Sequence, residues 1–235
     1  MICLVSGGLD SLALWRHLGF PNALQCLIGT KPEEREIEAV DTFAERYGAQ
    51  VERVRLSMPA ELPNGYLPHR NALMILTAMQ RDPHVYLAQV AEWGPDKNQR
   101  YFRHLERLAR AGVTSATHVP DKLPTPRIVT PFASKTKADL ITEYVTEYHS
   151  TDILTHSWSC YGAGRVHCGK CWGCRSRHTG EVKAGHQVTE YEHQPTPIPI
   201  SRNMIGDGLL WLAGNGPILT AKQAARRPAE RHVTH

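Results

Sequence analysis

Apolar and polar residues follow two different periods along the first 150 residues of the chain. Short apolar runs predict buried strands at 2–5, 23–28, 51–56, 85–91, 128–129 and 152–156. Apolar residues spaced three and four apart predict helices over 10–18, 33–47, 70–80, 98–111 and 137–148. Strands that are separated by helices predict an α/β fold, with a doubly wound and mostly parallel sheet that is covered on both faces.

The pattern changes after residue 156, which predicts three parts. Residues 1–156 are expected to form a nucleotide-binding α/β domain, and 157–184 a zinc-binding segment rich in cysteine, glycine and basic residues. Residues 185–235 are expected to form a C-terminal extension that is partly docked and partly flexible. In it, the proline-rich stretch 193–201 predicts extended chain, the apolar stretch 208–214 predicts a docked segment, and a basic tail follows.

The charge balance and the cysteines narrow the class of protein only slightly. There are 27 Lys and Arg against 23 Asp and Glu, so the formal net charge is +4, which is compatible with an anionic ligand. No secretory or membrane-spanning stretch is evident, and a cytoplasmic location is therefore expected, where thiols are reduced or bind metal. Cys3 and Cys26 fall on predicted strands and are expected to be buried and inert.

A glycine turn, SGGLDS, directly follows the first predicted strand and begins the first helix. Gly7 and Gly8 allow close approach of a phosphate, to which the free amides at the helix N-terminus also point. The hydroxyls of Ser6 and Ser11 can donate to phosphate oxygens, and Asp10 is a candidate Mg²⁺ ligand. The alternative is an ordinary strand-to-helix turn. The nucleotide-binding residues are therefore expected to be Ser6, Gly7, Gly8, Leu9, Asp10 and Ser11.

The turn lacks the lysine of a Walker loop and resembles the pyrophosphate loop of the ATP pyrophosphatase superfamily. The resemblance implies a Rossmann-like (HUP-type) fold and cleavage of ATP, with its Mg²⁺, between the α and β phosphates. The products would be AMP and pyrophosphate.

Four of the six cysteines lie within fifteen residues, as Cys160, Cys168, Cys171 and Cys174. Two overlapping C-x-x-C turns and a fourth cysteine can complete a tetrahedron, which favours a structural Zn²⁺ with four thiolate ligands. An iron–sulfur cluster is the alternative metal centre, whereas a redox pair would need only two cysteines. His167 is expected beside the site or on the surface. Basic residues are expected to offset the thiolate charge: Lys170, Arg175 and Arg177.

The glycine turn near the start of residues 1–183 and the cysteine-rich segment near their end together resemble the QueC family of 7-cyano-7-deazaguanine synthases. The segment HSWSC…HCGKCWGCRSR carries the most specific likeness. LPHRNALMILTA, at 67–78, resembles a helix of that family and indicates Arg70 and Asn71. TPFASKTKADLI, at 130–141, resembles a second family segment and indicates Lys137 and Asp139.

The resemblance implies a ligase that forms carbon–nitrogen bonds in queuosine biosynthesis. Its substrates would be ATP, ammonia and 7-carboxy-7-deazaguanine, and its product a nitrile reached through adenylated intermediates and an amide. Asp10, Ser11, Lys137 and Arg70 would be catalytic, unless Lys137 and Arg70 are merely solvated helix residues. Arg70, Asn71 and Asp96 would contact the base. Direct binding of nucleic acid or membrane is not expected, and a homodimer is compatible with the sequence.

One loop departs from the family's pattern, because Lys97 stands where a cysteine is expected. Three other functions therefore stay open. The enzyme could stop at the amide or transfer the base to a macromolecule, it could modify tRNA, or the chain could bind nucleotides without catalysis. The intact SGGLDS turn argues against the last of these.

Overall fold

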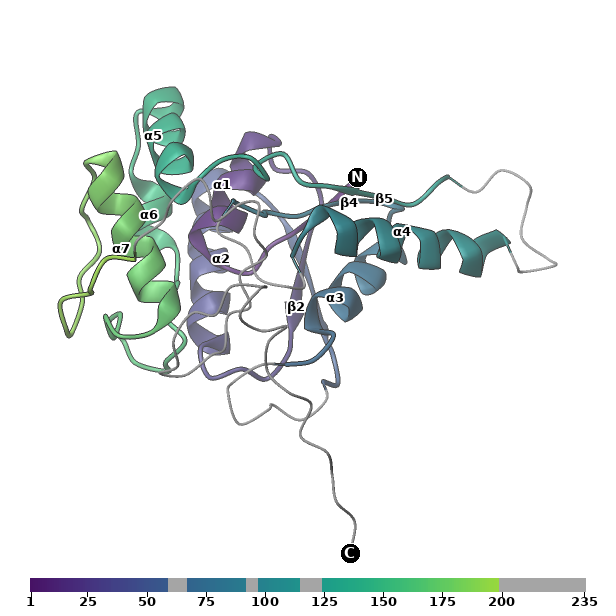
Figure 1. Cartoon of the computed structure of the whole chain (residues 1–235), viewed down its shortest axis with the longest axis horizontal. Coiled ribbons are helices and arrows are strands. Elements are labelled where there is room, and N and C mark those ends of the chain that lie inside the picture. Colours follow the sequence, from purple (N-terminus) through teal and green to yellow (C-terminus); the bar gives the residue numbers. More distant parts are fainter. Residues whose placement is uncertain (59–66, 92–96, 115–123, 199–235) are drawn as a thin grey trace, which may run out of the picture.

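A computed structural model describes residues 1–58, 67–91, 97–114 and 124–198 of the chain. Its centre is a parallel sheet of five strands in the order β3-β2-β1-β4-β5 (Figure 1). The strands are β1 (Ile2–Leu4), β2 (Ala23–Leu27), β3 (Val51–Arg55), β4 (His84–Tyr86) and β5 (Arg127–Val129). This order is that of a doubly wound, Rossmann-like sheet, as the sequence pattern predicts.

Helices cover both faces of the sheet, and the alternation of side chains along β1 shows how. Cys3 and Val5 point to one face, where they pack against α1 (Leu9–His17), α2 (Glu33–Tyr47), α5 (Lys137–Tyr148) and α6 (Asp152–His156). Ile2 and Leu4 point to the other face, against α3 (Arg70–Met79) and α4 (Gln99–Thr114). The two apolar clusters account for the uninterrupted apolar run at the start of the chain.

Local signals set the ends of several helices where the sequence predicts them. Gly48 ends α2 in the left-handed conformation, with φ of 63°. Thr136 caps α5, because its hydroxyl accepts from the Asp139 amide while the Asp139 carboxylate accepts from the Thr136 amide. Asn98 accepts from the amide of Tyr101 at the start of α4.

Two predicted strands are corrected by the structure. The stretch 152–156 is the short helix α6, in which Thr151 accepts backbone hydrogen bonds from Leu154 and Thr155. Periodicity over five residues does not separate a buried strand from a buried helical turn. The strand predicted at 85–91 ends at Tyr86 as β4, after which the chain continues beside β5 through single contacts such as Leu87 N–H to Val129 O, 3.1 Å.

Helix α7 (Trp172–Ala184) belongs to the cysteine-rich segment and packs along α5 (Figure 1). Its Arg177 is fully buried and forms an ion pair with Glu181 at 2.9 Å. The same guanidinium donates to the carbonyl oxygens of Leu154 and Ser157, so α7 is anchored to α6 and to the residue that follows it. These contacts satisfy a charge that would be costly to bury alone.

The first part of the C-terminal extension docks on α7. Ile198 is buried, and its amide donates to the hydroxyl of Thr179 at 2.8 Å. The predicted apolar stretch 208–214 and the basic tail lie outside the described residues. The division into three parts stays a prediction. None of the helices in the described ranges combines the length and apolar character needed to cross a lipid bilayer.

Candidate functional site

The SGGLDS turn lies at the carboxyl end of β1, between the strand and α1. Chain order reverses here, because β2 and β3 extend the sheet to one side of β1 while β4 and β5 extend it to the other. In parallel α/β sheets, ligands bind outside the carboxyl ends of the strands at such a switch point. The turn therefore occupies the position in the fold where a nucleotide is expected.

A residue with a Cβ does not fit at position 7, for two reasons. Its φ is 76°, in the region that side chains disfavour, and a Cβ there would lie 2.4 Å from the carbonyl oxygen of Glu36. The turn is thus packed directly against the first turn of α2. Gly8 has an ordinary φ of −74° and serves as the N-terminal cap residue of α1.

The two serines of the turn form a small hydrogen-bonded ring. The Ser11 hydroxyl is buried, donates to the Gly8 carbonyl at 2.9 Å and accepts from the Ser6 amide at 3.1 Å. Ser11 therefore shapes the turn. The Ser6 side chain is exposed and lies 3.2 Å from the Ser11 hydroxyl, so it is the serine that faces the solvent side of the turn.

Asp10 and Lys137 form an ion pair that joins the turn to the first residue of α5. The Lys137 side chain is only 10% exposed. Its aliphatic part lies against Gly180 of α7, where an added Cβ would be 2.9 Å from Lys137 Cγ. The structure thus brings together two predicted site residues that are 127 positions apart, and α7 helps to hold the lysine in place.

Of the remaining predicted site residues, two lie at the start of α3, the helix that contacts β1 and β4. Arg70 and Asn71 begin α3, and Asn71 is buried. Arg70 acts electrostatically on Glu36 and on Tyr161, and Asp10 also acts on Tyr161. Asp96 lies outside the described residues.

Glu36 is a further candidate site residue, one that the sequence pattern does not indicate. Burial raises its pKa to about 7, and the positive charges of Arg70 and Lys97 counteract this in part. In the sequence, Glu36 is one of several acidic residues in the polar first turn of a helix, so no pattern distinguishes it. Its position becomes clear only when Gly7 is seen to contact the backbone of the same residue.

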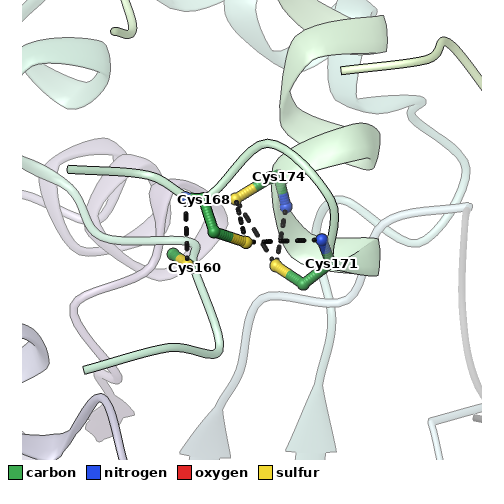
Figure 2. Close-up of side chains that lie close together, drawn as sticks. All are labelled: Cys160, Cys168, Cys171 and Cys174. Atoms are coloured by element: carbon green, nitrogen blue, oxygen red, sulfur yellow. Dashed lines mark hydrogen bonds between the residues drawn. The ribbon is translucent and has the colours of Figure 1, made fainter. Parts of the chain in front are cut away.

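The four clustered cysteines converge, as Figure 2 shows. Their sulfur atoms all lie within 4.8 Å of one another, with Cys171 and Cys174 3.4 Å apart and Cys168 and Cys174 3.9 Å apart. A tetrahedral zinc site with Zn–S bonds of about 2.3 Å has sulfur atoms about 3.8 Å apart. The cluster therefore fits a four-coordinate metal ion.

The surroundings of the cluster favour thiolates. Backbone amides donate to the sulfur atoms, among them Gly162 to Cys160 at 3.3 Å and Cys174 to Cys171 at 3.4 Å. Hydrogen bonds from Cys160 and Cys174 lower the pKa of Cys171, whereas hydrogen bonds with Cys160 and Cys171 raise the pKa of Cys174. Of the basic residues expected to offset this charge, Arg177 is instead paired with Glu181 and Arg175 donates to the Thr196 carbonyl. The backbone amides provide the nearer compensation.

The other two cysteines are separate from the cluster. Cys3 is fully buried on β1, as predicted, and burial raises the pKa of its thiol to about 12. Cys26 on β2 is only partly buried, and burial raises its pKa to about 11. Neither thiol is suited to act as a nucleophile at neutral pH.

The cysteine segment is attached to the glycine turn through Trp158. The Trp158 amide donates to the Gly7 carbonyl at 2.8 Å. Its indole ring packs against His167 in a tilted arrangement, with ring centroids 4.3 Å apart, and His167 Nε2 accepts from the Ser159 amide. His167 is buried beside the cluster, where burial and then the nearby Arg177 lower its pKa to about 4. His167 is therefore a buried neutral imidazole next to the cysteine cluster.

Comparison with known proteins now decides the family. The family description "Queuosine biosynthesis protein QueC" matches residues 48–185. This chain belongs to the QueC family. The matched range includes the Arg70 helix, Lys137 and all four clustered cysteines, whereas the glycine turn at 6–11 lies before it.

Curated relatives of the QueC-family chain are named 7-cyano-7-deazaguanine synthase. Those of Methanothrix thermoacetophila, Paracoccus denitrificans and Chloroherpeton thalassium are each 27% identical to it. The alignments cover 82%, 81% and 84% of this chain and 98%, 92% and 99% of the relatives. The likeness therefore extends over nearly the whole length of each relative.

Proposed function

We propose that this chain is an ATP-dependent ligase that converts 7-carboxy-7-deazaguanine and ammonia to 7-cyano-7-deazaguanine. The observation that carries the proposal is the placement of the SGGLDS turn at the switch point of the sheet. There Asp10 forms an ion pair with Lys137, and the Gly7 carbonyl accepts a hydrogen bond from the cysteine segment. The name shared by the relatives supplies the substrate class.

In this proposal the turn binds the phosphates of ATP. The free amides at the start of α1 and the exposed Ser6 hydroxyl face the β and γ phosphates. Asp10 would hold Mg²⁺, which supplies charge neutralisation to the pyrophosphate as it leaves. Lys137, displaced from Asp10 by the metal ion, would move its charge to the phosphate oxygens. Arg70, at the start of α3, is the second cation for this purpose.

Two activations of the same base follow. A carboxylate oxygen attacks the α-phosphorus of ATP, pyrophosphate leaves, and a mixed anhydride with AMP forms. Ammonia then attacks the carbonyl carbon, AMP leaves with the former carboxylate oxygen, and an amide remains. The amide oxygen attacks the α-phosphorus of a second ATP, a second pyrophosphate leaves, and the adenylated amide then loses AMP and, over both steps, two protons to yield the nitrile. Positioning of the phosphates contributes most of the rate in both rounds.

Glu36 is proposed to assist the nitrogen transfer. Ammonia reaches the site as ammonium at neutral pH and must lose a proton before it attacks. A carboxylate with a pKa of about 7 beside the phosphate turn is suited to accept that proton. Asn71 and Asp96 are proposed to contact the base.

The metal at Cys160, Cys168, Cys171 and Cys174 is proposed to be zinc in a structural role. Four thiolates leave no open position for a water or substrate. By fixing the segment that bears Trp158 and Gly180, the site would hold both the glycine turn and Lys137 in place.

A second candidate function is release of the amide before its second activation. Lys97 favours it, because this residue replaces an expected cysteine and its charge acts on Glu36. In that case the amide would be the final product. Lys97→Cys tests the cause, since restoring the family's residue should raise the share of nitrile.

The experiment that tests the proposal identifies the product by mass. Purified full-length protein is incubated with ATP, Mg²⁺, ammonium and 7-carboxy-7-deazaguanine. A base with the mass of the nitrile supports the synthase, and the mass of the amide supports the second candidate. An unchanged carboxylate, with protein that is folded and loaded with metal, would contradict both.

A further inference from the structure

Helix α4 carries a stripe of arginines on its outer side. Arg100, Arg103, Arg107 and Arg110 are spaced three, four and three residues apart, and all four are exposed. This spacing places them on one face of a helix, over about 15 Å of its axis. We call these four residues the α4 arginine stripe. Figure 1 shows α4 on the outside of the molecule, on the side away from α5 and α7.

The inner face of α4 is already occupied. Phe102 and Leu105 are buried in the apolar cluster between α3, α4 and the sheet. Glu106 is the one acidic residue of the helix, and its carboxylate accepts the Ile128 amide at the edge of β5, 2.7 Å away. The one carboxylate of α4 is thus engaged with β5 and can offset at most one of the four positive charges.

Five other cations of the described surface differ from the stripe. Ion pairs with acidic side chains neutralise them: Arg35, Arg53, Arg55, Arg81 and Lys135. Within the described residues, Arg100, Arg103 and Arg107 make no ion pair with an acidic side chain. These three guanidinium groups repel one another, and an external polyanion would relieve that repulsion.

We infer that the α4 arginine stripe is a docking surface for the phosphate backbone of a nucleic acid. Guanidinium groups bind phosphate oxygens in a bidentate geometry, and successive arginines on one helix face match a series of closely spaced phosphates. This departs from the expectation that nucleic acid is not bound directly, because a net charge of +4 averages over the whole chain and conceals a local concentration of charge.

An anionic lipid surface and a protein partner fit the stripe less well than a nucleic acid does. An anionic lipid surface is bound by helices whose apolar face can enter the membrane, but the apolar face of α4 is covered, and on its outer side the exposed apolar side chain is Leu108. A stable protein interface needs buried aromatic or apolar anchors, which the stripe does not offer. Phosphate-backbone binding needs only the charges.

The test measures binding of the full chain to fluorescent oligonucleotides, one single-stranded and one duplex, between 50 and 200 mM NaCl. Three phosphate contacts should weaken binding by about 15- to 40-fold over this range. Arg103→Gln with Arg107→Gln should weaken binding at 50 mM at least tenfold and reduce the salt dependence. Arg103→Lys with Arg107→Lys should retain most of the binding, because the charges remain.

Two matched variants each remove two charges elsewhere. Arg35→Gln with Arg81→Gln removes two ion-paired surface arginines, and Arg226→Gln with Arg227→Gln removes two from the basic C-terminal stretch. Both should bind like the parent protein. Thermal melts confirm that all variants are folded.

Several outcomes would overturn the inference. They are the absence of binding at 50 mM NaCl, an equal loss in a control pair, and tighter binding of polyglutamate or of phosphatidylserine vesicles than of either oligonucleotide. Whichever oligonucleotide binds more tightly, the single-stranded or the duplex one, identifies the form of nucleic acid that the stripe prefers.

Discussion

A single ion pair, between Asp10 and Lys137, connects the glycine turn to the first turn of α5. The Lys137 side chain is nearly buried, and the pair with Asp10 offsets part of the cost of taking its amino group out of water. The pair also keeps both side chains at the place where the account needs a Mg²⁺ ligand and a phosphate-neutralising cation.

Asp10→Asn should reduce ATP cleavage by about 100-fold or more, because the neutral amide is a poor ligand for Mg²⁺. The amide still accepts a hydrogen bond from Lys137, so the free energy of unfolding should fall by only about 1 kcal/mol. Release of AMP measures the first quantity and urea unfolding the second. Asp41→Asn, at a carboxylate that pairs with Arg53 on the surface, is the control and should retain full turnover.

The raised pKa of Glu36 predicts a specific pH dependence of the free energy of unfolding. Its pKa is about 7 in the folded protein and about 4.5 when it is unperturbed. Between these values the folded state binds more protons than the unfolded state, so this residue makes stability decrease as pH rises from about 4.5 to 7, by about 3 kcal/mol in total. Above pH 7 its contribution is constant.

Glu36→Gln should remove this part of the pH dependence. Urea unfolding of the parent and the variant at pH 5 to 8 measures the difference between the two proteins. The exposed Glu38→Gln is the control and should follow the parent at every pH. If Glu36→Gln runs parallel to the parent as well, the carboxyl group is not buried as described.

At the scale of elements, the packing of α7 on α5 determines where Lys137 lies. Gly180 leaves room for the aliphatic part of the lysine, with Lys137 Cγ and Ile141 Cδ1 both within 3.3 Å of an added Cβ. A contact so close displaces one of the two neighbours by a few tenths of an ångström, and displacements of that kind in a site reduce rate more than stability.

Gly180→Ala should therefore lower the turnover number about 10- to 100-fold while the melting temperature changes little, since alanine favours the helix as much as the contact disfavours it. Gly112→Ala on α4 is the matched control, because an added Cβ there meets nothing within 4 Å. It should leave turnover unchanged. Equal turnover of Gly180→Ala and the parent would show that α7 does not position Lys137.

How well each element could be predicted depends on its length and its ends. The helices α2 and α5 have long amphipathic patterns and clear terminal residues, in Gly48 and in the Thr136–Asp139 box, and both were predicted correctly. The five residues of α6 contain too little pattern to separate helix from strand, and that prediction was wrong.

At the scale of the whole molecule, the four-cysteine cluster, the turn and Lys137 form one connected assembly. Spacing alone predicted that the cysteines would converge, because C-x-x-C turns are local geometry. The bond from Trp158 to Gly7 and the position of Glu36 could not be predicted, because each depends on how distant segments pack.

Removing the metal should therefore impair more than the cysteine segment. Stripping zinc with a chelator should speed hydrogen exchange at 157–184 and also at 6–11, and ATP cleavage should fall in parallel, because the turn loses its anchor at Trp158. Cys171→Ser should behave like the stripped protein, and Cys26→Ser like the parent. Faster exchange confined to 157–184, with normal turnover, would mean that the two sites are independent. Elemental analysis should find one zinc per chain, and iron would contradict the assignment.

The most direct measurement of the central claim counts the nucleotide products for each base converted. Reaction mixtures are quenched before ATP is exhausted, and AMP, ADP, pyrophosphate and the base product are separated and quantified. The account predicts two AMP for each nitrile formed, since an acid and then an amide are each activated once, and it predicts no ADP above the background of protein-free samples. ADP and phosphate as the main products, or ATP cleavage that does not depend on the base, would contradict it.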